Sequence, residues 1–239
     1  MRSRFYAVLS VPVFAILYSY TAIGVIIVII MAEFRMKKAI TRIIQLWAKS
    51  VFFIMGKRFR IYGKENMNRD NRYILVANHG SLFDIVAIVS FYPGISWFGR
   101  ERLLKIPLFS KILKMTDYVP FKEPTYRNTR HMIEQLNDKS DHKTIAIFPE
   151  GTRTLDGKIN VFYRGFIHLF RSKELEILPV TLNGFYSLKP KNRSYINFGS
   201  KLSVVVHKPI TRESLTDKSD AEILNAVKSA IESAYAPTY

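Results

Sequence analysis

Apolar positions along the chain follow three successive patterns. From Tyr6 to Ala32 there is no charged side chain over 27 residues. Residues 36–55 then repeat apolar side chains at helical spacing, with basic and polar residues on the opposite side, and Gly56 is a plausible stop. After Gly63, short apolar runs alternate with amphipathic stretches. These patterns predict a long apolar helix, a basic amphipathic helix and an α/β domain.

The strand candidates are short runs rich in β-branched and aromatic residues, bounded by turn residues. They are residues 60–62, 73–77, 95–98, 118–121, 144–148, 177–182, 195–198 and 202–206. The helix candidates of this part are residues 82–91, 107–114, 125–137, 163–172 and 213–234. The fold class expected is α/β, a mixed β-sheet covered by helices. We expect a hydrophobic membrane anchor at 1–34, a basic amphipathic interfacial helix at 35–58 and the α/β domain at 59–239.

The first segment is long enough to cross a bilayer, which needs about 20 apolar residues. A cleaved signal peptide is the competing interpretation, because Arg2 and Arg4 form a basic start. The apolar run is, however, about twice the length of a signal-peptide core. Pro12 and Gly24 leave a re-entrant or surface-lying helix open. We therefore expect a retained anchor.

Positive charge is concentrated beside this segment. The chain has 36 Lys and Arg against 19 Asp and Glu, and residues 1–64 alone carry +10 of the net +17. This distribution favours an anionic phospholipid membrane as partner, and makes nucleic acid the weaker choice. Basic residues follow the anchor more densely than they precede it, which predicts a cytoplasmic (inner) membrane location with the domain facing the cytoplasm. The absence of cysteine excludes disulfides, thiolate metal sites and a cysteine nucleophile.

Candidate chemistry begins where the apolar run 73–77 ends. The sequence continues with Asn78, His79, Gly80, Ser81 and, three residues on, Asp84. Ser81 suits a helix N-cap, and Asp84 then folds back toward the loop that carries His79. A histidine oriented by a carboxylate can serve as general base for an alcohol, and Gly80 would let the backbone turn sharply.

Three plainer interpretations of this loop remain open. Asp84 could merely cap the helix while His79 is an ordinary loop histidine. Metal binding is disfavoured, because the five histidines are scattered along the chain. A serine hydrolase acting through Ser81 would lack the glycines of a nucleophile elbow.

A second loop follows the strand candidate 144–148 and reads Phe148-Pro-Glu-Gly-Thr-Arg153. Arg153 and the Thr152 hydroxyl suit an anionic oxygen, and Gly151 permits close backbone approach. By itself this loop could be an ordinary turn. Together, the two loops predict an alcohol-activating base beside an anion-binding loop.

Asn-His-x-x-x-x-Asp at 78–84, Phe-Pro-Glu-Gly-Thr-Arg at 148–153 and Leu-Pro-Val at 178–180 resemble, in order and spacing, the glycerolipid acyltransferase family, especially bacterial lysophosphatidic acid acyltransferases. The resemblance spans roughly residues 63–208 and implies a glycerol-phosphate acyltransferase-like fold. It implies His79 as general base and Asp84 as its orienting carboxylate. The substrate-binding residues expected with them are Asn78, Ser81, Lys122, Glu150, Gly151, Thr152, Arg153, Arg164 and Pro179.

One position departs from the family pattern. The family's second motif usually ends in an arginine after a short apolar strand, where this chain has Lys122 and Glu123. Lys122, Arg127 or Arg130 could take that role, or Lys122 could be a solvated surface lysine. Glu123 therefore leaves the acceptor headgroup open.

The expected reaction is direct acyl transfer from acyl-CoA or acyl carrier protein to the hydroxyl of a lysophospholipid, most of all 1-acylglycerol 3-phosphate. No cysteine is available and no serine is placed as a nucleophile, so we expect no covalent acyl-enzyme. We also expect no metal and no redox cofactor. The alternatives are another acceptor, such as glycerol 3-phosphate, another lysophospholipid or a lyso-aminolipid, and a basic membrane-binding scaffold without catalysis.

Overall fold

The computed structural model describes residues 2–68, 70–105, 118–121 and 144–236. Its helices are α1 (Arg2–Glu33), α2 (Lys37–Ile54), α3 (Phe83–Phe91), α6 (Gly165–Ser172), α7 (Phe185–Leu188) and α8 (Asp220–Ser233). Short 3₁₀ turns are η1 (Lys64–Asn66), η2 (Glu101–Lys105) and η3 (Glu213–Leu215). The strands are β1 (Phe59–Tyr62), β2 (Tyr73–Ala77), β3 (Ser96–Arg100), β4 (Val119–Phe121), β5 (Ile145–Ile147), β6 (Glu176–Asn183) and β7 (Leu202–Val206).

The strands form one mixed sheet in the order β1-β7-β6-β2-β5-β3-β4. Strands β6 and β7 pair antiparallel, and every other neighbouring pair is parallel. The central strand β2 lies between β5 and β6, with Leu75 opposite Ala146 and Leu178. All five of its residues are buried, as expected of a strand covered on both faces. The predicted mixed α/β fold is confirmed.

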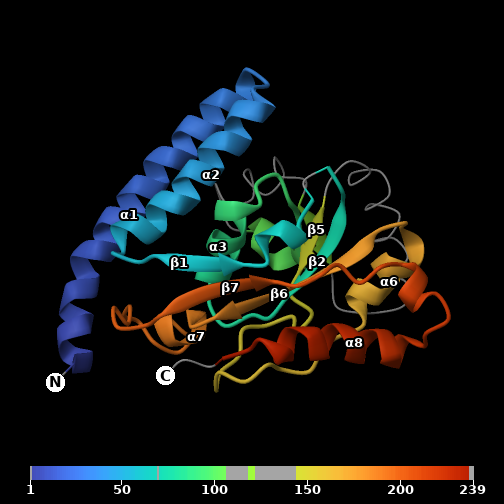
Figure 1. Ribbon diagram of the computed structural model, residues 1–239. Coiled ribbons are helices and arrows are strands. Elements are labelled where there is room, and N and C mark those ends of the chain that lie inside the picture. The colour runs from blue at the N-terminus through green and yellow to red at the C-terminus, as the bar shows by residue number, and fades with distance from the viewer. Residues whose placement is uncertain (1, 69, 106–117, 122–143, 237–239) are drawn as a thin grey trace.

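The alternation of side chains along β2 divides the core in two. Tyr73, Leu75 and Ala77 pack in a cluster with α2 and α3, whereas Ile74 and Val76 pack with α6 and α8. Figure 1 shows α8 and α6 on the side of the sheet away from α3. Because helices cover both faces of the sheet, a ligand can reach it most easily at the polar loops that follow the strand ends.

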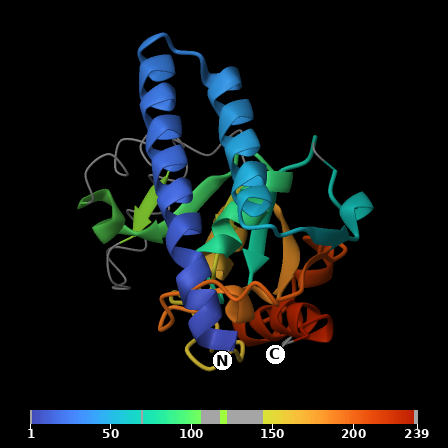
Figure 2. The same cartoon turned by 90° about the vertical axis from the view of Figure 1, so that its left-hand side faces the viewer.

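Helices α1 and α2 form an antiparallel hairpin against one side of this domain (Figure 2). The indole Nε1 of Trp47 in α2 donates to Thr21 Oγ1 in α1 at 3.2 Å. Helix α1 also contacts the domain directly, since the Ile196 N–H donates to Ser10 Oγ at 2.9 Å and the Tyr6 ring packs edge-on against Phe198. The hairpin is therefore docked on the domain through α2, which packs on α3, and through the start of α1.

Two predicted elements are wrong. Residues 195–198 are a loop and not a strand, and Ile196 is buried there against α1. The helix predicted over 213–234 is interrupted, because Ser219 and Glu222 form a capping box that starts α8 at Asp220. The helices predicted at 107–114 and 125–137 lie outside the described residues.

Candidate active site

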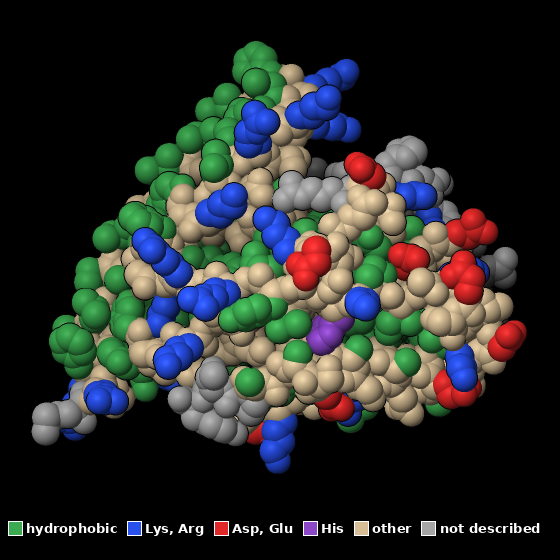
Figure 3. All heavy atoms as spheres, viewed as in Figure 1, with side chains coloured by type: hydrophobic (Ala, Val, Ile, Leu, Met, Phe, Trp, Pro, Cys, Tyr) green, Lys and Arg blue, Asp and Glu red, His purple; other side chains and the backbone are tan. Residues whose placement is uncertain are grey.

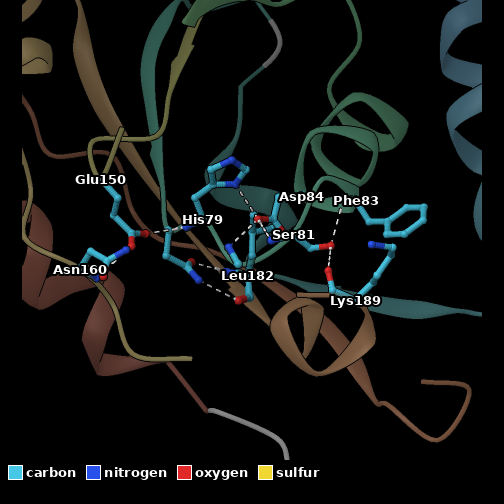
Figure 4. A network of polar contacts seen from close by, with 10 residues as sticks. His79, Ser81, Phe83, Asp84, Glu150, Asn160, Leu182 and Lys189 are labelled. Carbon is cyan, nitrogen blue, oxygen red and sulfur yellow. Dashed lines mark hydrogen bonds and ion pairs between the residues drawn. The ribbon is translucent and has the colours of Figure 1, made fainter. Parts of the chain in front are cut away.

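His79 and Asp84 lie where β2 leaves the sheet and α3 begins. The Nδ1 atom of His79 is 2.8 Å from Asp84 Oδ2, and the same oxygen accepts the backbone N–H groups of Gly80 and Ser81, each at 2.7 Å (Figure 4). Asp84 is fully buried, while the His79 side chain keeps 13% of its surface exposed. With a proton on Nδ1, the Nε2 atom is left to accept one. The geometry fits an oriented general base.

The start of α3 differs in one detail from the prediction. The N-cap residue is Leu82, without a side-chain cap, and not Ser81. Ser81 Oγ instead donates to the Lys189 carbonyl at 2.7 Å, and Asp84 folds back onto the Ser81 N–H as expected. Gly80 is not in the left-handed region. Its missing side chain allows a close approach, because a Cβ there would lie 3.1 Å from the backbone nitrogen of Tyr186, which is tighter than an ordinary contact.

Asn78 links this loop to β6. Its amide nitrogen donates to the Leu182 carbonyl at 3.0 Å, and its amide oxygen accepts the Leu182 N–H at 2.8 Å. Both ends of the buried amide therefore bind the backbone, which extends the β2–β6 pairing by one residue. This places Asn78 as a residue that positions His79.

Glu150 joins the second loop to the first. Its Oε1 accepts the His79 N–H at 2.6 Å, and its Oε2 accepts the Asn160 N–H at 2.8 Å. Figure 4 shows Glu150 on the opposite side of the His79 backbone from Asp84. The carboxyl is 2% exposed, and this burial raises the pKa of Glu150 to about 7, against the lowering effect of the Asn160 and His79 N–H groups. Glu150 thus holds the loop, with both oxygens occupied.

Two aromatic residues that the sequence analysis missed support the imidazole. The Phe148 ring stacks on the His79 ring with centroids 4.0 Å apart and planes 12° apart. Trp97 stacks in turn on Phe148 at 5.6 Å. The sequence places Phe148 directly after the β5 run and His79 just after β2. Because β2 and β5 are paired, the two residues leave the sheet side by side, and this position was the available signal for their contact.

Three cationic side chains, Arg153, Lys189 and Arg193, are linked by electrostatic interactions through Lys189. Burial lowers the pKa of the Arg153 guanidinium, and the negative charge of Asp84 opposes that shift. Burial, and then the charges of Arg153 and Arg193, lower the pKa of Lys189. The Lys189 ammonium donates to the Arg193 carbonyl at 2.8 Å. Lys189 and Arg193 belong to no motif of the sequence analysis, and the fold brings Lys189 within electrostatic range of Arg153.

The other predicted site residues have different surroundings. Gly151 turns the loop at a φ of 63°, and Thr152 beside it is exposed. Arg164 is exposed at the start of α6, and its side chain has no bond within the described part of the chain. Pro179 is buried in the middle of β6, opposite Val76. Lys122 lies outside the described residues. The structure therefore groups Arg153 with His79 and Asp84, and leaves Pro179 in the sheet.

Within the described ranges, no three His, Asp or Glu side chains gather as a metal would require. The absence of a metal or other cofactor from the reaction stays a prediction.

A family model for acyltransferases matches residues 58–183, which include both loops. The chain belongs to the acyltransferase family. The matched region starts just before β1 and ends with β6, so it includes the strands that carry His79 and Glu150.

Several similar proteins are named as 1-acyl-sn-glycerol-3-phosphate acyltransferases. The chain is 26% identical over 170 residues to the chloroplastic 1-acyl-sn-glycerol-3-phosphate acyltransferase LPAT1 of Arabidopsis thaliana, covering 70% of this chain and 48% of that protein. It is 28% identical over 161 residues to the 1-acyl-sn-glycerol-3-phosphate acyltransferase of Borreliella burgdorferi, covering 66% and 63%. The chain spans about half the length of the plant and algal relatives that it matches.

One solved structure is similar over nearly the whole chain. The crystal structure of the 1-acyl-sn-glycerophosphate acyltransferase PlsC from Thermotoga maritima superposes with a TM-score of 0.80 at 26% identity. The match covers 98% of this chain and 95% of that chain. The similarity therefore includes the N-terminal hairpin as well as the α/β domain.

Proposed function

We propose that this acyltransferase transfers an acyl chain from a thioester to the free hydroxyl of 1-acylglycerol 3-phosphate, which gives phosphatidic acid. The observation that carries the proposal is the His79 ring, fixed by Asp84 on one nitrogen and open at the other. The relatives described above are named as acyltransferases of this same acceptor, which supports this choice. Acyl-CoA or acyl carrier protein would be the donor.

In the proposed reaction, Nε2 of His79 takes the proton of the acceptor hydroxyl while the oxygen attacks the thioester carbonyl. The imidazolium formed is stabilised by Asp84 at Nδ1. The tetrahedral intermediate then collapses, the C–S bond breaks, and the proton on Nε2 passes to the leaving thiolate. Transfer is direct, because no serine or cysteine is placed as a nucleophile in the described site.

The acceptor phosphate would bind at the cations beside the catalytic histidine. Arg153 suits this role, since a guanidinium binds phosphate oxygens through paired hydrogen bonds. Lys189, which donates to the Arg193 carbonyl, is within electrostatic range of Arg153 and adds a second positive charge near it. The grouping of these cations supports a phosphate-bearing acceptor over a neutral one.

We further propose that the hairpin enters a single leaflet of the membrane. Helix α1 is long and apolar enough to span a bilayer by composition, and an 18-residue window within it has a mean hydropathy of 2.5. However, its first half contacts the domain through Tyr6 and Ser10, and its second half contacts α2 through Thr21. The first half of α1 is therefore held against the domain, and the second half pairs with α2, which itself packs on α3 of the domain. This arrangement favours a hairpin that lies in one leaflet over a crossing helix. The active site would then face lipid-borne acceptors on the side that holds the thioester donor.

A panel of acceptors tests the function. Purified full-length protein should consume acyl-CoA or acyl carrier protein thioester in the presence of 1-acylglycerol 3-phosphate, and far less with glycerol 3-phosphate or lysophosphatidylcholine. His79→Ala should lower that rate by at least about 10²-fold, as expected for loss of a general base. Preference for another acceptor would reassign the substrate. Two results would contradict the proposal. One is that no acceptor of the panel supports thioester consumption. The other is that His79→Ala retains activity within threefold of the parent.

A further inference from the structure

A cleft of about 390 Å³ opens between α2, the edge strand β1 and α3. None of its lining residues belongs to the loops that carry His79 and Glu150. Its apolar floor includes Phe52, Phe59 and Phe91. The proposed reaction assigns nothing to this cleft.

The rim of the cleft is positively charged. Lys49 from α2, Arg58 before β1 and Lys64 from η1 line it, and all three are exposed. No carboxylate lines the cleft, and none of the three side chains has a salt bridge or hydrogen bond to the described part of the chain. Three cations, from α2, from the residue before β1 and from η1, therefore border one cleft whose described lining holds no carboxylate.

Lys57, the fourth cation of the cleft, has a different role. Its ammonium is buried and donates to the carbonyls of Phe198 and Ser200, the first at 2.5 Å and the second at 2.8 Å. These bonds fix the chain between α2 and β1 to the loop on which α1 docks. Lys57 thus adds positive charge behind the rim and is itself already bonded.

Backbone features hold the rim in place. Gly56, at a φ of 63°, ends α2 and turns the chain toward Arg58. Gly63 then turns it into η1, and a Cβ at Gly63 would lie 2.0 Å from the Val206 carbonyl oxygen. On the far side of the cleft, Gln45 of α2 donates to the Ser90 carbonyl of α3 at 3.1 Å. The spacing of the cations is therefore set by the fold.

Exposed apolar side chains border this rim. Leu46 and Phe53 of α2 are 55% and 77% exposed. They lie three residues before and four residues after Lys49, so they are its neighbours on the helix surface. Figure 3 shows Lys and Arg side chains along the boundary between the apolar surface of the hairpin and the α/β domain. A ligand that fits has an anionic headgroup for the cleft and an apolar chain for the helix.

We infer that the cleft binds one anionic glycerophospholipid of the surrounding leaflet, with its phosphate at Lys49, Arg58 and Lys64 and an acyl chain along Leu46 and Phe53. Arginine and lysine bind phosphate through charge-assisted hydrogen bonds, which are stronger where the surroundings are apolar. The bound lipid joins α2 to the edge of the sheet. This inference uses the membrane association proposed above and does not depend on acyl transfer.

Phosphatidylglycerol is the probe, because it is neither acceptor nor product of the proposed reaction. Full-length protein in a nonionic detergent receives equal amounts of phosphatidylglycerol and phosphatidylcholine, and native mass spectrometry counts the lipids retained. We expect one phosphatidylglycerol, bound in preference to phosphatidylcholine. Lys49→Gln/Lys64→Gln should weaken its retention by at least about tenfold. The charge-preserving Lys49→Arg/Lys64→Arg should retain it.

Lys37→Gln/Lys38→Gln is the matched control, because it removes two exposed charges from the same helix outside the cleft. This variant should keep the lipid. Equal loss in the control would mean diffuse attraction and would overturn the inference. Unchanged lipid retention in Lys49→Gln/Lys64→Gln would also overturn it, as would loss of the lipid in the arginine variant with unaltered thermal unfolding. Displacement of the lipid by an equal concentration of glycerol 3-phosphate or inorganic phosphate would overturn it too. Each readout is taken without a thioester, so none depends on catalysis.

Discussion

The imidazole of His79 is held by neighbours on three sides. Asp84 binds its Nδ1, Phe148 stacks on its face, and Glu150 holds its backbone N–H. A side chain so constrained loses little freedom when substrate arrives, which is a source of rate acceleration. The pair was predicted from both loops and the family resemblance together, because residues 79 and 84 alone also fit a helix cap beside an ordinary loop histidine. For the stacking ring, the position of Phe148 after the β5 run was the only signal, and its contact with His79 depends on β5 lying next to β2.

Asp84→Asn tests the electrostatic part of this arrangement. The amide keeps an oxygen for the Gly80 and Ser81 N–H groups, but it lacks the negative charge that stabilises the imidazolium. We expect kcat to fall by about 10²–10⁴-fold while KM for the acceptor changes little. Steady-state kinetics and thermal unfolding of the same preparation measure this.

Asp156→Asn is the matched control for this variant. It also removes one carboxylate charge, from an exposed loop position that binds Lys158 and Thr154 and does not touch His79. Its kcat should remain near that of the parent. If Asp84→Asn unfolds at a much lower temperature while its folded fraction is fully active, Asp84 serves only to hold the helix start.

Glu150 is a buried carboxyl whose protonation makes the stability of the protein depend on pH. Burial raises its pKa to about 7 from an ordinary value of 4.5. Between these values the folded protein keeps a proton that the unfolded chain releases, so its contribution to stability falls as pH rises from about 4.5 to about 7.

Glu150→Gln removes this titration and keeps one acceptor oxygen. The free energy of unfolding of the parent should therefore decline relative to that of the variant across this pH window. Denaturant unfolding of both proteins at several pH values between 4 and 8 measures the difference. Parallel pH profiles would show that Glu150 does not titrate in this range.

At the scale of elements, the sequence analysis succeeded where burial alone determines the structure. Strand β2 is buried on both faces and matches its predicted bounds, whereas residues 195–198, also rich in apolar and aromatic side chains, form a loop against α1. Apolar residues report burial and not strand pairing, so the two cases look alike in sequence. The break before α8 had a local signal, the Ser219-x-x-Glu222 capping box, inside a continuous helical pattern.

At the scale of the whole molecule, the hairpin and the domain form one docked unit, which makes their orientation testable. The chain contains no cysteine, so single cysteines can be introduced at Arg4, Arg35 and Lys208. All three positions are exposed. In sealed vesicles, a membrane-impermeant maleimide should label all three from the same side, as a hairpin in one leaflet requires. A crossing helix would instead leave Arg4→Cys protected until detergent opens the vesicles.

The pairing of β1 with β7 has a consequence for how the chain is made. Phe59 lies opposite Leu202, and Lys57 bonds to a carbonyl 141 residues further along the chain. At roughly 5–20 residues per second, a ribosome needs on the order of ten seconds to add the missing strand. During that interval α1 and α2 already exist, without the loop at residues 196–200 on which they later dock. The apolar hairpin therefore meets lipid or a chaperone before it meets its own domain, and the sheet closes beside a helix pair that is already placed.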